Sequence, residues 1–426
     1  MPPAVDTDRR PLLLIWEVTQ ACDLTCEHCR ASAHPNRHPD ELTTAEGKEL
    51  LDQVASFGDR QLLVLSGGDP MKRPDLVELV EYGTERGLIV SLTPSGTENL
   101  DAEEIEALAD AGLKRIALSL DGPDAESHDA FRGEAGSFEA TMEAAEAARA
   151  AGIPLQINTT VCGSTVDDLP AIRDRVADLG AVLWSVFFLV PVGRGRILEQ
   201  ISPDRAEVVM SWLSEVADDA PFGVKTTEAP HYRRVKHQQA ATGAANAATN
   251  DGRDGRAGSD PDGPPGGSGG PPGGSDGPPG GSGGPPGGSG GPPGGGRGDS
   301  NSGSGGGSRR KGVVAGDGFV FVSHTGEVYP SGFLPKSAGT VPEDDVVDVY
   351  RNADLFESLR DRDQLRGKCG ACPFNAVCGG SRSRAYAATG DPLAADPLCA
   401  FVPDGYDGPL PWEGTSDGAP SPEAGD

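Results

Sequence analysis

The stretch ACDLTCEHCRAS, residues 21–32, places three cysteines at positions 22, 26 and 29. An apolar run of strand length, residues 11–19, comes directly before it. Three thiols this close together can form a disulfide, bind zinc, or hold three irons of a cubane iron–sulfur cluster. A structural zinc site needs four protein ligands, and no fourth cysteine completes the set locally. On a four-iron cluster, three thiolates would leave one iron open to a small molecule.

The composition narrows the possible settings for these cysteines. The chain has 426 residues, eight cysteines and a formal net charge of −29. It shows neither a charged-then-apolar leader nor an apolar run long enough to cross a bilayer, which predicts a cytoplasmic protein in which thiols stay reduced and the disulfide is disfavoured. We expect neither nucleic acid nor a membrane as partner, because an acidic surface repels both. Such acidity with few lysines is typical of a halophilic protein.

A low-complexity segment divides the chain. Between residues 264 and 296 the heptapeptide PPGGSGG recurs with one Asp variant and offers nothing apolar to bury. Its period of seven excludes collagen, which needs glycine at every third position. We therefore predict a disordered Gly/Pro/Ser-rich insertion over residues 238–312, and an acidic flexible tail over residues 404–426.

Upstream of this insertion, apolar runs alternate with helical patterns. Five further runs of strand length follow the first, and capping signals at Thr43 with Glu46 and at Asp101 with Glu104 mark helices between them. Such alternation predicts an α/β fold, a partial (β/α)6 TIM-type barrel over residues 11–237. In such barrels the chemistry gathers at the carboxyl ends of the strands, and the cysteine triplet directly follows the first one. The five runs are residues 60–68, 88–96, 114–122, 154–161 and 181–193.

The spacing Cys-x₃-Cys-x₂-Cys after a first strand closely resembles the radical S-adenosylmethionine (SAM) family. In that family SAM chelates the open iron through its amino and carboxylate groups. The resemblance implies that Cys22, Cys26 and Cys29 are the catalytic ligands of a 4Fe-4S cluster and that SAM is a cofactor. His28 fills a slot where the family often has an aromatic residue. As a fourth ligand it would close the site that the chemistry needs open.

Two further segments resemble the parts of this family that hold SAM. SGGDP (66–70) follows the second run and is similar to the Gly-Gly-Glu-Pro motif beside the methionine amino group, with Asp69 in place of Glu. SLDGPDAESHDAFRG (119–133) resembles the segment whose serine and arginine hold the SAM carboxylate. Strand-end positions on the fifth and sixth runs resemble the ribose and adenine contacts less specifically, and ordinary turns or strand ends explain them as well. The resemblance thus implies cofactor contacts from Gly67, Gly68, Asp69, Pro70, Ser119, Arg132, Asn158, Thr160 and Val190.

A second cysteine set lies beyond the insertion, in CGACPFNAVCGGSRSRAYAATGDPLAADPLC (369–399). It resembles the SPASM extension, which in full form binds two auxiliary 4Fe-4S clusters. Ser331 and Arg382 stand where two cysteines of one of these clusters are expected, so the resemblance implies one auxiliary 4Fe-4S cluster in a small cysteine-rich iron–sulfur domain, residues 313–403. A zinc ribbon remains an alternative, because four thiolates suit zinc equally well. The implied ligands are Cys369, Cys372, Cys378 and Cys399.

Outside both sets, Cys162 stands alone and is interpreted as a core or strand-end cysteine.

Three short segments are similar to the haem-biosynthesis subgroup of this family: EAPHYRR (228–234), YPSGFLP (329–335) and CGGSRSRAYAATGD (378–391). That subgroup includes iron-coproporphyrin decarboxylases, didecarboxysirohaem deacetylases and haem d₁ assembly proteins. A tetrapyrrole with several carboxylates needs cationic clamps, although arginines can equally pair with surface carboxylates. The candidate clamps are Arg194, Arg196, Arg233, Arg234, Arg382 and Arg384.

The resemblance implies an oxidoreductase or lyase that reductively cleaves SAM to a 5′-deoxyadenosyl radical, which abstracts hydrogen from the substrate. The substrate would be a tetrapyrrole, the auxiliary cluster an electron sink, and the electron donor a ferredoxin or flavodoxin. Two alternatives stay open. One is a radical SAM maturase that modifies a small ribosomal peptide, and the other is a non-catalytic iron–sulfur or zinc redox protein.

Overall fold

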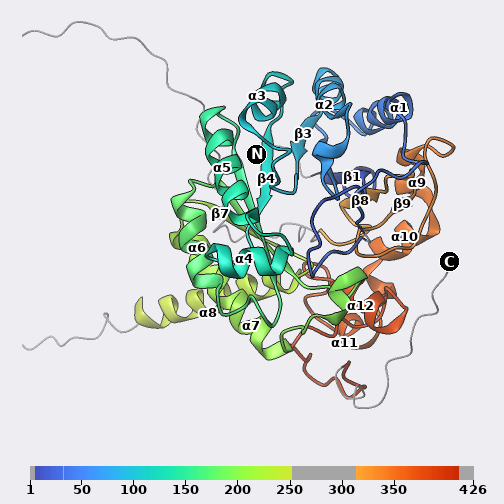
Figure 1. The fold of residues 1–426 in the computed structure, drawn as a ribbon. Coiled ribbons are helices and arrows are strands. Elements are labelled where there is room, and N and C mark those ends of the chain that lie inside the picture. The colour runs from blue at the N-terminus through green and yellow to red at the C-terminus, as the bar shows by residue number, and fades with distance from the viewer. Residues whose placement is uncertain (1–4, 32, 252–312, 412–426) are drawn as a thin grey trace, which may run out of the picture. The chain divides into compact units, whose positions relative to one another are not determined.

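The computed structural model describes residues 5–31, 33–251 and 313–411. Residues 1–239 and 307–426 form one compact unit, and residues 240–306 form a second. The first unit contains a nine-stranded sheet in the order β7-β6-β5-β4-β3-β2-β1-β8-β9, with helices packed outside it (Figure 1). β1 to β8 run parallel, and β9 pairs antiparallel with β8. Because no further strand among the described residues pairs with β7 or β9, the sheet is an open partial barrel, as expected for the fold class.

The six apolar runs all form strands, each shorter than its run, and β3 and β6 cover only about half of theirs. Three further strands were not foreseen, because β7 is polar and short and because β8 and β9 lie beyond the insertion. Strand β8 pairs with β1, so the segment placed in the cysteine-rich domain continues the barrel sheet. The strands are β1 (Leu13–Thr19), β2 (Leu62–Gly67), β3 (Ile89–Leu92), β4 (Arg115–Ser119), β5 (Leu155–Val161), β6 (Leu183–Phe188), β7 (Gly223–Thr227), β8 (Phe319–Val322) and β9 (Val328–Tyr329).

Helices follow most strands, and two of them start at the predicted capping signals. Thr43 and Glu46 form a reciprocal capping box, and Asp101 accepts a hydrogen bond from the Glu104 N–H, so each satisfies amides that the first helical turn leaves free. The helices are α1 (Thr44–Ala55), α2 (Leu76–Glu85), α3 (Ala102–Asp110), α4 (Ala125–Arg132), α5 (Ser137–Ala150), α6 (Leu169–Asp178), α7 (Pro203–Asp219), α8 (His231–Asp251), α9 (Val346–Asn352), α10 (Asp354–Arg360), α11 (Gly367–Gly370) and α12 (Arg382–Thr389), with 3₁₀ turns η1 (Pro70–Lys72), η2 (Gly193–Ile197) and η3 (Arg362–Gln364).

The two faces of the sheet differ in what covers them. Alternate strand residues, such as Leu14, Trp16 and Val18 of β1, are fully buried in one core with the helices. Burial of each large apolar side chain of this kind contributes roughly 1.5–3 kcal/mol. Their neighbours Leu13 and Ile15 lie on the opposite side and are only half-buried. We call this opposite side the inner face of the sheet.

The predicted insertion is wrong at its start. Helix α8 continues to Asp251, whereas disorder was predicted from residue 238. The segment QQAATGAANAAT (238–249) is rich in alanine, which has the highest helix propensity, so the sequence favours a helix over these residues. Residues 252–312, with the PPGGSGG repeats, and residues 412–426 of the tail lie outside the described residues. Among the helices that the structure does describe, none is both long and apolar enough to span a bilayer.

Candidate active site

The loop with the first three cysteines leaves the carboxyl end of β1 and is held from three sides. The Asp69 N–H donates to the Ala21 carbonyl (2.7 Å), and the Glu27 N–H donates to the carbonyl of Phe131 at the end of α4 (3.1 Å). Arg194 donates from its N–H to the Cys29 carbonyl (2.9 Å) and from its Nε to the Cys26 carbonyl (2.8 Å). These hydrogen bonds brace the backbone of the loop against the neighbouring segments.

Glycines are required where neighbouring loops press on this cysteine loop. A Cβ on Gly67 would lie 2.3 Å from the Thr19 carbonyl oxygen, and one on Gly68 would lie 2.5 Å from that of Ala21. On the other side, Gly193 has φ +54, and its Cβ would lie 2.3 Å from the Arg30 carbonyl oxygen. These distances are shorter than any real Cβ contact. Glycine is therefore needed at both positions of the Gly-Gly pair, because it lets the backbone come this close to the cysteine loop.

The Asp69 carboxylate is fully buried and binds protein groups. It accepts hydrogen bonds from the Met71 N–H (3.2 Å), the Ser95 N–H (3.4 Å) and the Thr97 hydroxyl (2.8 Å). Ser95 also lies 3.6 Å from the Cys22 sulfur and donates to the Gly68 carbonyl. The sequence reasoning missed Ser95 and Thr97, although the turn segment PSG (94–96) at the end of the third run was a signal.

Arg132 is buried close to all three thiols. Its Nη1 lies 3.5 Å from Asp121 Oδ2, while its buried Nε has no hydrogen-bond partner among the described residues. Asp121, which the sequence reasoning also missed, accepts from the Thr160 N–H at 2.7 Å. Burial raises the pKa of the Cys26 thiol, and the Arg132 charge opposes that rise. A thiol in such surroundings ionises readily once iron binds, because ligation stabilises the thiolate.

His28 is stacked on the Phe131 ring, with centroids 4.8 Å apart and planes 10° apart. Burial lowers the pKa of His28 to about 4, so its ring is neutral at pH 7. Its buried Nδ1 has no partner among the described residues. This stacking matches the aromatic character expected at this slot and gives the ring a flat face beside the loop.

The other predicted cofactor residues lie at the carboxyl ends of β4, β5 and β6. Ser119 and Asn158 are paired across β4 and β5, and both are half-buried. Thr160 is buried at the end of β5, and Val190 is buried just after β6. Pro70 begins the 3₁₀ turn η1 after the glycine pair. The fold thus brings all of them to the strand ends that carry the cysteine loop.

This arrangement fits the cofactors that the sequence implied. The donor set consists of three free thiols on one loop, as an open cluster needs. The buried Arg132 Nε and Arg194 Nη2 have no partners among the described residues, so each can donate to an anionic ligand such as a SAM carboxylate. His28 and the backbone at Gly67 and Gly68 complete the surroundings of that open position.

The second cysteine set gathers around one small pocket. Cys369, Cys372, Cys378 and Cys399 all line it, together with His231, Arg234, Lys368, Asn375, Gly379, Gly380 and Phe401. Among the described residues, no three His, Cys, Asp or Glu side chains converge closely enough to hold a single metal ion. Four thiols around a pocket suit a cluster, which is larger than one ion.

The surroundings of this second set favour a negatively charged cluster. The Asp396 and Gly380 N–H groups donate to the sulfurs of Cys369 and Cys378, each at 3.4 Å. Arg382 Nη2 lies 3.7 Å from the Cys369 sulfur. Burial raises the pKa of Cys378, so donors and cations are needed to keep its thiolate. Such hydrogen bonds to sulfur also tune cluster potentials.

The interpretation of Arg382 and Arg384 as substrate clamps is wrong. Both side chains are fully buried: Arg382 donates to the carbonyls of Gly380, Pro392 and Ala394. Arg384 donates to the carbonyls of Phe188, Leu189 and Glu228 and lies 3.3 Å from Asp396. A buried guanidinium satisfies its five donors locally, which motif likeness does not reveal.

The other candidate arginines differ in their surroundings. Arg234 is paired with Glu207 at 2.5 Å, and Arg233 donates to the Val313 carbonyl at 3.0 Å. Arg194 supports the cysteine loop, and Arg196 is exposed on η2. The first two thus bind protein groups, although the buried Nε of Arg234, like Nη2 of Arg194, has no hydrogen-bond partner among the described residues.

Cys162 is fully buried and packs with Phe131 and Leu189, as interpreted from the sequence.

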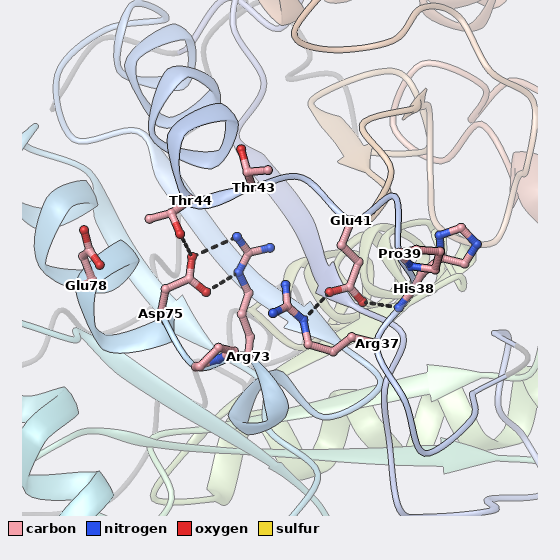
Figure 2. Close-up of a pocket in the computed structure, with 10 residues that line it drawn as sticks. Arg37, His38, Pro39, Glu41, Thr43, Thr44, Arg73, Asp75 and Glu78 are labelled. Carbon is pink, nitrogen blue, oxygen red and sulfur yellow. Dashed lines mark hydrogen bonds and ion pairs between the residues drawn. The ribbon is translucent and has the colours of Figure 1, made fainter.

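A surface depression of about 610 Å³ lies away from both cysteine sets, between the start of α1 and the segment before α2 (Figure 2). Its charged side chains pair with one another: Arg73 with Asp75 at 2.8 Å, and Arg37 with Glu41 at 2.6 Å. No cysteine lines it, and its buried charges are already satisfied. Its size therefore does not make it the active site.

Comparison with known proteins agrees with this geometry. The radical SAM superfamily model matches residues 16–176. The chain is 37% identical to the AdoMet-dependent heme synthase of Methanosarcina barkeri, over 92% of this chain and 97% of that protein. The synthase of the same name from Nitratidesulfovibrio vulgaris is 34% identical, over 92% of each. SuiB of Streptococcus suis, solved with S-adenosylmethionine, shares the fold with a TM-score of 0.60 at 14% identity, over 92% of this chain and 78% of that one.

The fold and the open cysteine triplet are those of a radical SAM enzyme. The chain belongs to the radical SAM superfamily, and its full-length similarity places it beside the AdoMet-dependent heme synthases. It is therefore an enzyme that uses a 4Fe-4S cluster and SAM, with the auxiliary cluster typical of its subgroup.

Proposed function

We propose that this enzyme makes haem from iron-coproporphyrin by oxidative decarboxylation of two propionates. In each step a propionate loses a hydrogen atom, one electron and CO₂, and becomes a vinyl group. When bound, SAM and its cluster supply the radical chemistry that removes the hydrogen atom. The pairing of a three-thiol site with a four-thiol site in one chain supports the proposal, because the reaction needs both a hydrogen acceptor and an electron acceptor.

We assign Cys22, Cys26 and Cys29 to the open cluster, and the strand-end residues to SAM. In this assignment Arg132 and Ser119 hold the SAM carboxylate, and the backbone at Gly67 and Gly68 lies beside its amino group. Asp121 is a positioning residue. Its carboxylate lies beside the Arg132 guanidinium and accepts a hydrogen bond from the Thr160 N–H at the end of β5. Asp69, Pro70, Asn158, Thr160 and Val190 shape the rest of the cofactor site.

We assign Cys369, Cys372, Cys378 and Cys399 to one auxiliary cluster that accepts the electron left by decarboxylation. The domain boundaries proposed from the sequence go with this assignment: a barrel at residues 11–237 and an auxiliary-cluster region at residues 313–403. An external donor such as ferredoxin or flavodoxin would reduce the open cluster. The need for reduced thiols supports a cytoplasmic setting.

An anaerobic assay tests the proposal. Enzyme reconstituted with iron and sulfide is incubated with SAM, a reductant and iron-coproporphyrin, and the porphyrin is analysed by mass spectrometry. We expect loss of two carboxyl groups and formation of 5′-deoxyadenosine. If enzyme with both clusters filled changes neither iron-coproporphyrin nor didecarboxysirohaem, the haem proposal is wrong, and peptide modification becomes the function to test.

A further inference from the structure

Two cationic side chains on the inner face of the sheet lack partners. Arg115 is the first residue of β4, and Lys225 lies in the middle of β7. Over residues 5–31, 33–251 and 313–411, neither side chain makes a hydrogen bond or an ion pair. In a chain with net charge −29, which offers carboxylates almost everywhere, two unpaired cations mark a place that acidic side chains avoid.

Both side chains point to the inner face. Ile116, Leu118 and Leu120, which alternate with Arg115, belong to the helix-covered core, and Val224 beside Lys225 packs against that core. Part of the Lys225 side chain is open to solvent, although protein atoms surround its ammonium group. The two cations therefore share the accessible side of a curved sheet.

The two charges also act on one another. Strands β5 and β6 separate β4 from β7, yet Arg115 contributes to lowering the pKa of Lys225 to about 8, after the larger effect of burial. Interaction across two intervening strands is expected on a concave face, where side chains converge. Two like charges near one another are unfavourable without a counter-ion, so the site is suited to an anionic ligand.

The inner face is more apolar on one side of the sheet and more polar on the other. Strands β3, β2, β1 and β8 present half-buried apolar side chains: Ile89, Leu62, Val64, Leu13, Ile15 and Phe319. Strands β4, β5 and β7 present mainly polar ones: Arg115, Ser119, Gln156, Asn158, Lys225 and Thr227. Strand β6, between β5 and β7, adds the half-buried Leu183 and Phe187 and the buried Ser185. A flat apolar ring with carboxylates along one edge is complementary to both halves at once.

We propose that Arg115 and Lys225 bind the two carboxylates that the macrocycle keeps during the reaction. This inference rests on the proposed function, in which two of four propionates are lost and two remain on neighbouring corners of the ring. Carboxylates that react cannot stay clamped, whereas the retained pair needs partners throughout. Two cations close enough to influence each other match two neighbouring carboxylates in number and charge.

The position of the pair suits this role. Arg115 precedes Ser119 by four residues on the same strand, about 13 Å at the rise of a β-strand. The carboxylate held by Arg115 would thus lie deep on the inner face, whereas Lys225 is on the same register line as Ser185, Asn158 and Ser119. The reacting edge would lie toward the carboxyl ends of the strands, where the cysteine loop is. Arg115 and Lys225 act as specificity-determining residues in this arrangement.

Binding of haem, the product, tests the inference directly. Reconstituted wild type, Arg115→Gln, Lys225→Gln and the double variant are titrated anaerobically with haem and with haem dimethyl ester, and binding is followed by the Soret band. Each single variant should bind haem at least about tenfold more weakly, as expected for loss of one charged hydrogen bond. The ester should bind wild type and double variant alike. Arg173→Gln, an exposed arginine on α6, is the matched control and should bind haem as wild type does.

The outcomes separate this inference from the proposed function. Haem affinity within twofold of wild type in the double variant would overturn the inference, as would a wild type that binds haem and its ester equally. Loss of affinity for iron-coproporphyrin but not for haem would also overturn it, because the clamps would then hold the reacting propionates. A different result would show that the proposed function is wrong. In that case the wild type would bind haem more tightly than its ester and more tightly than the variants do, but would not decarboxylate iron-coproporphyrin. Reductive SAM cleavage without porphyrin should be equal in all variants, which checks that the fold and the cofactor site are intact.

Discussion

The hydroxyl of Ser331 donates a hydrogen bond to the carboxylate of Glu228 at 3.2 Å. The same carboxylate accepts from the hydroxyls of Ser381 and Ser383. Glu228 directly follows β7 and has φ +56, a left-handed backbone that is costly for a non-glycine residue. A carboxylate–hydroxyl network therefore occupies the position where Ser331 replaces an expected cysteine, and it joins the end of the barrel to the segment after Cys378.

We expect Glu228→Ala to destabilise the protein by about 2–4 kcal/mol, because three hydroxyl donors lose their shared acceptor. Chemical denaturation of wild type and variant measures the difference. Glu343→Ala, at an exposed glutamate with no side-chain partner in the described part of the chain, is the control and should change stability by less than about 0.5 kcal/mol. Equal stability of both variants would show that the network does not hold the two segments together.

Reconstituted wild type should bind about eight irons. The three thiolates of the first set and the four of the second set are each suited to hold one four-iron cluster. Replacement of Cys22, Cys26 and Cys29 by Ala should remove about half of that iron. Iron and sulfide analysis measures both values, with Cys162→Ala as the control that keeps all of it. Stoichiometric zinc at the second set, without iron, would contradict the two-cluster assignment.

Gly68→Ala should abolish cluster assembly on the first loop, because the new Cβ would lie 2.5 Å from the Ala21 carbonyl oxygen and push the loop away. Gly223→Ala is the matched control, since its Cβ would meet nothing nearer than 3.4 Å. The 400 nm absorbance of the cluster and the iron content report the outcome. A normal first cluster in Gly68→Ala would mean that the loop moves freely, against the bracing described above.

Arg384→Ala should lose about 3–5 kcal/mol of stability, because it leaves Asp396 and several buried carbonyls without their cation. SAM cleavage and substrate turnover should fall together in this variant. The exposed Arg366, paired with Asp391 on the surface, provides the control Arg366→Ala, which should keep both. Selective loss of substrate turnover in Arg384→Ala would instead restore the substrate-clamp interpretation.

The neutral His128 should make stability depend on pH. Burial lowers its pKa to about 4 from an ordinary value near 6.5, so the unfolded chain takes up the proton first as pH falls. The contribution of His128 to the free energy of unfolding is fully present above pH 6.5. It is lost as the pH falls toward 4, by about 1.4 kcal/mol per pH unit. Denaturation at pH 7.5 and 5.5 should show a loss of stability that is smaller in His128→Asn than in wild type by about 1.3 kcal/mol, while His28, whose pKa is lowered in the same way, contributes equally in both proteins. An equal loss in both proteins would contradict the assignment.

The sequence determined the barrel because its signals are local. Each parallel strand reads as a continuous apolar run, and Thr43 with Glu46 marks a helix start through atoms three residues apart. The cysteine triplet and the glycine pair are equally local, and both turned out to lie at the same end of the sheet. Strand β7 was not predicted, because its five residues form neither an apolar run nor a strict alternation of apolar and polar side chains.

Only the tertiary structure decided what the arginines do. In the sequence, Arg382 and Arg384 stand out as cations in an acidic chain, but whether a guanidinium meets solvent, substrate or buried carbonyls depends on segments far away, such as Leu189 for Arg384. Arg115 and Lys225 drew no attention, because 110 positions separate them and only the curvature of the sheet brings their charges together. Hydrogen-bond satisfaction and charge pairing are set by distances in space, and spacing along the chain fixes those distances only within one helix, strand or turn.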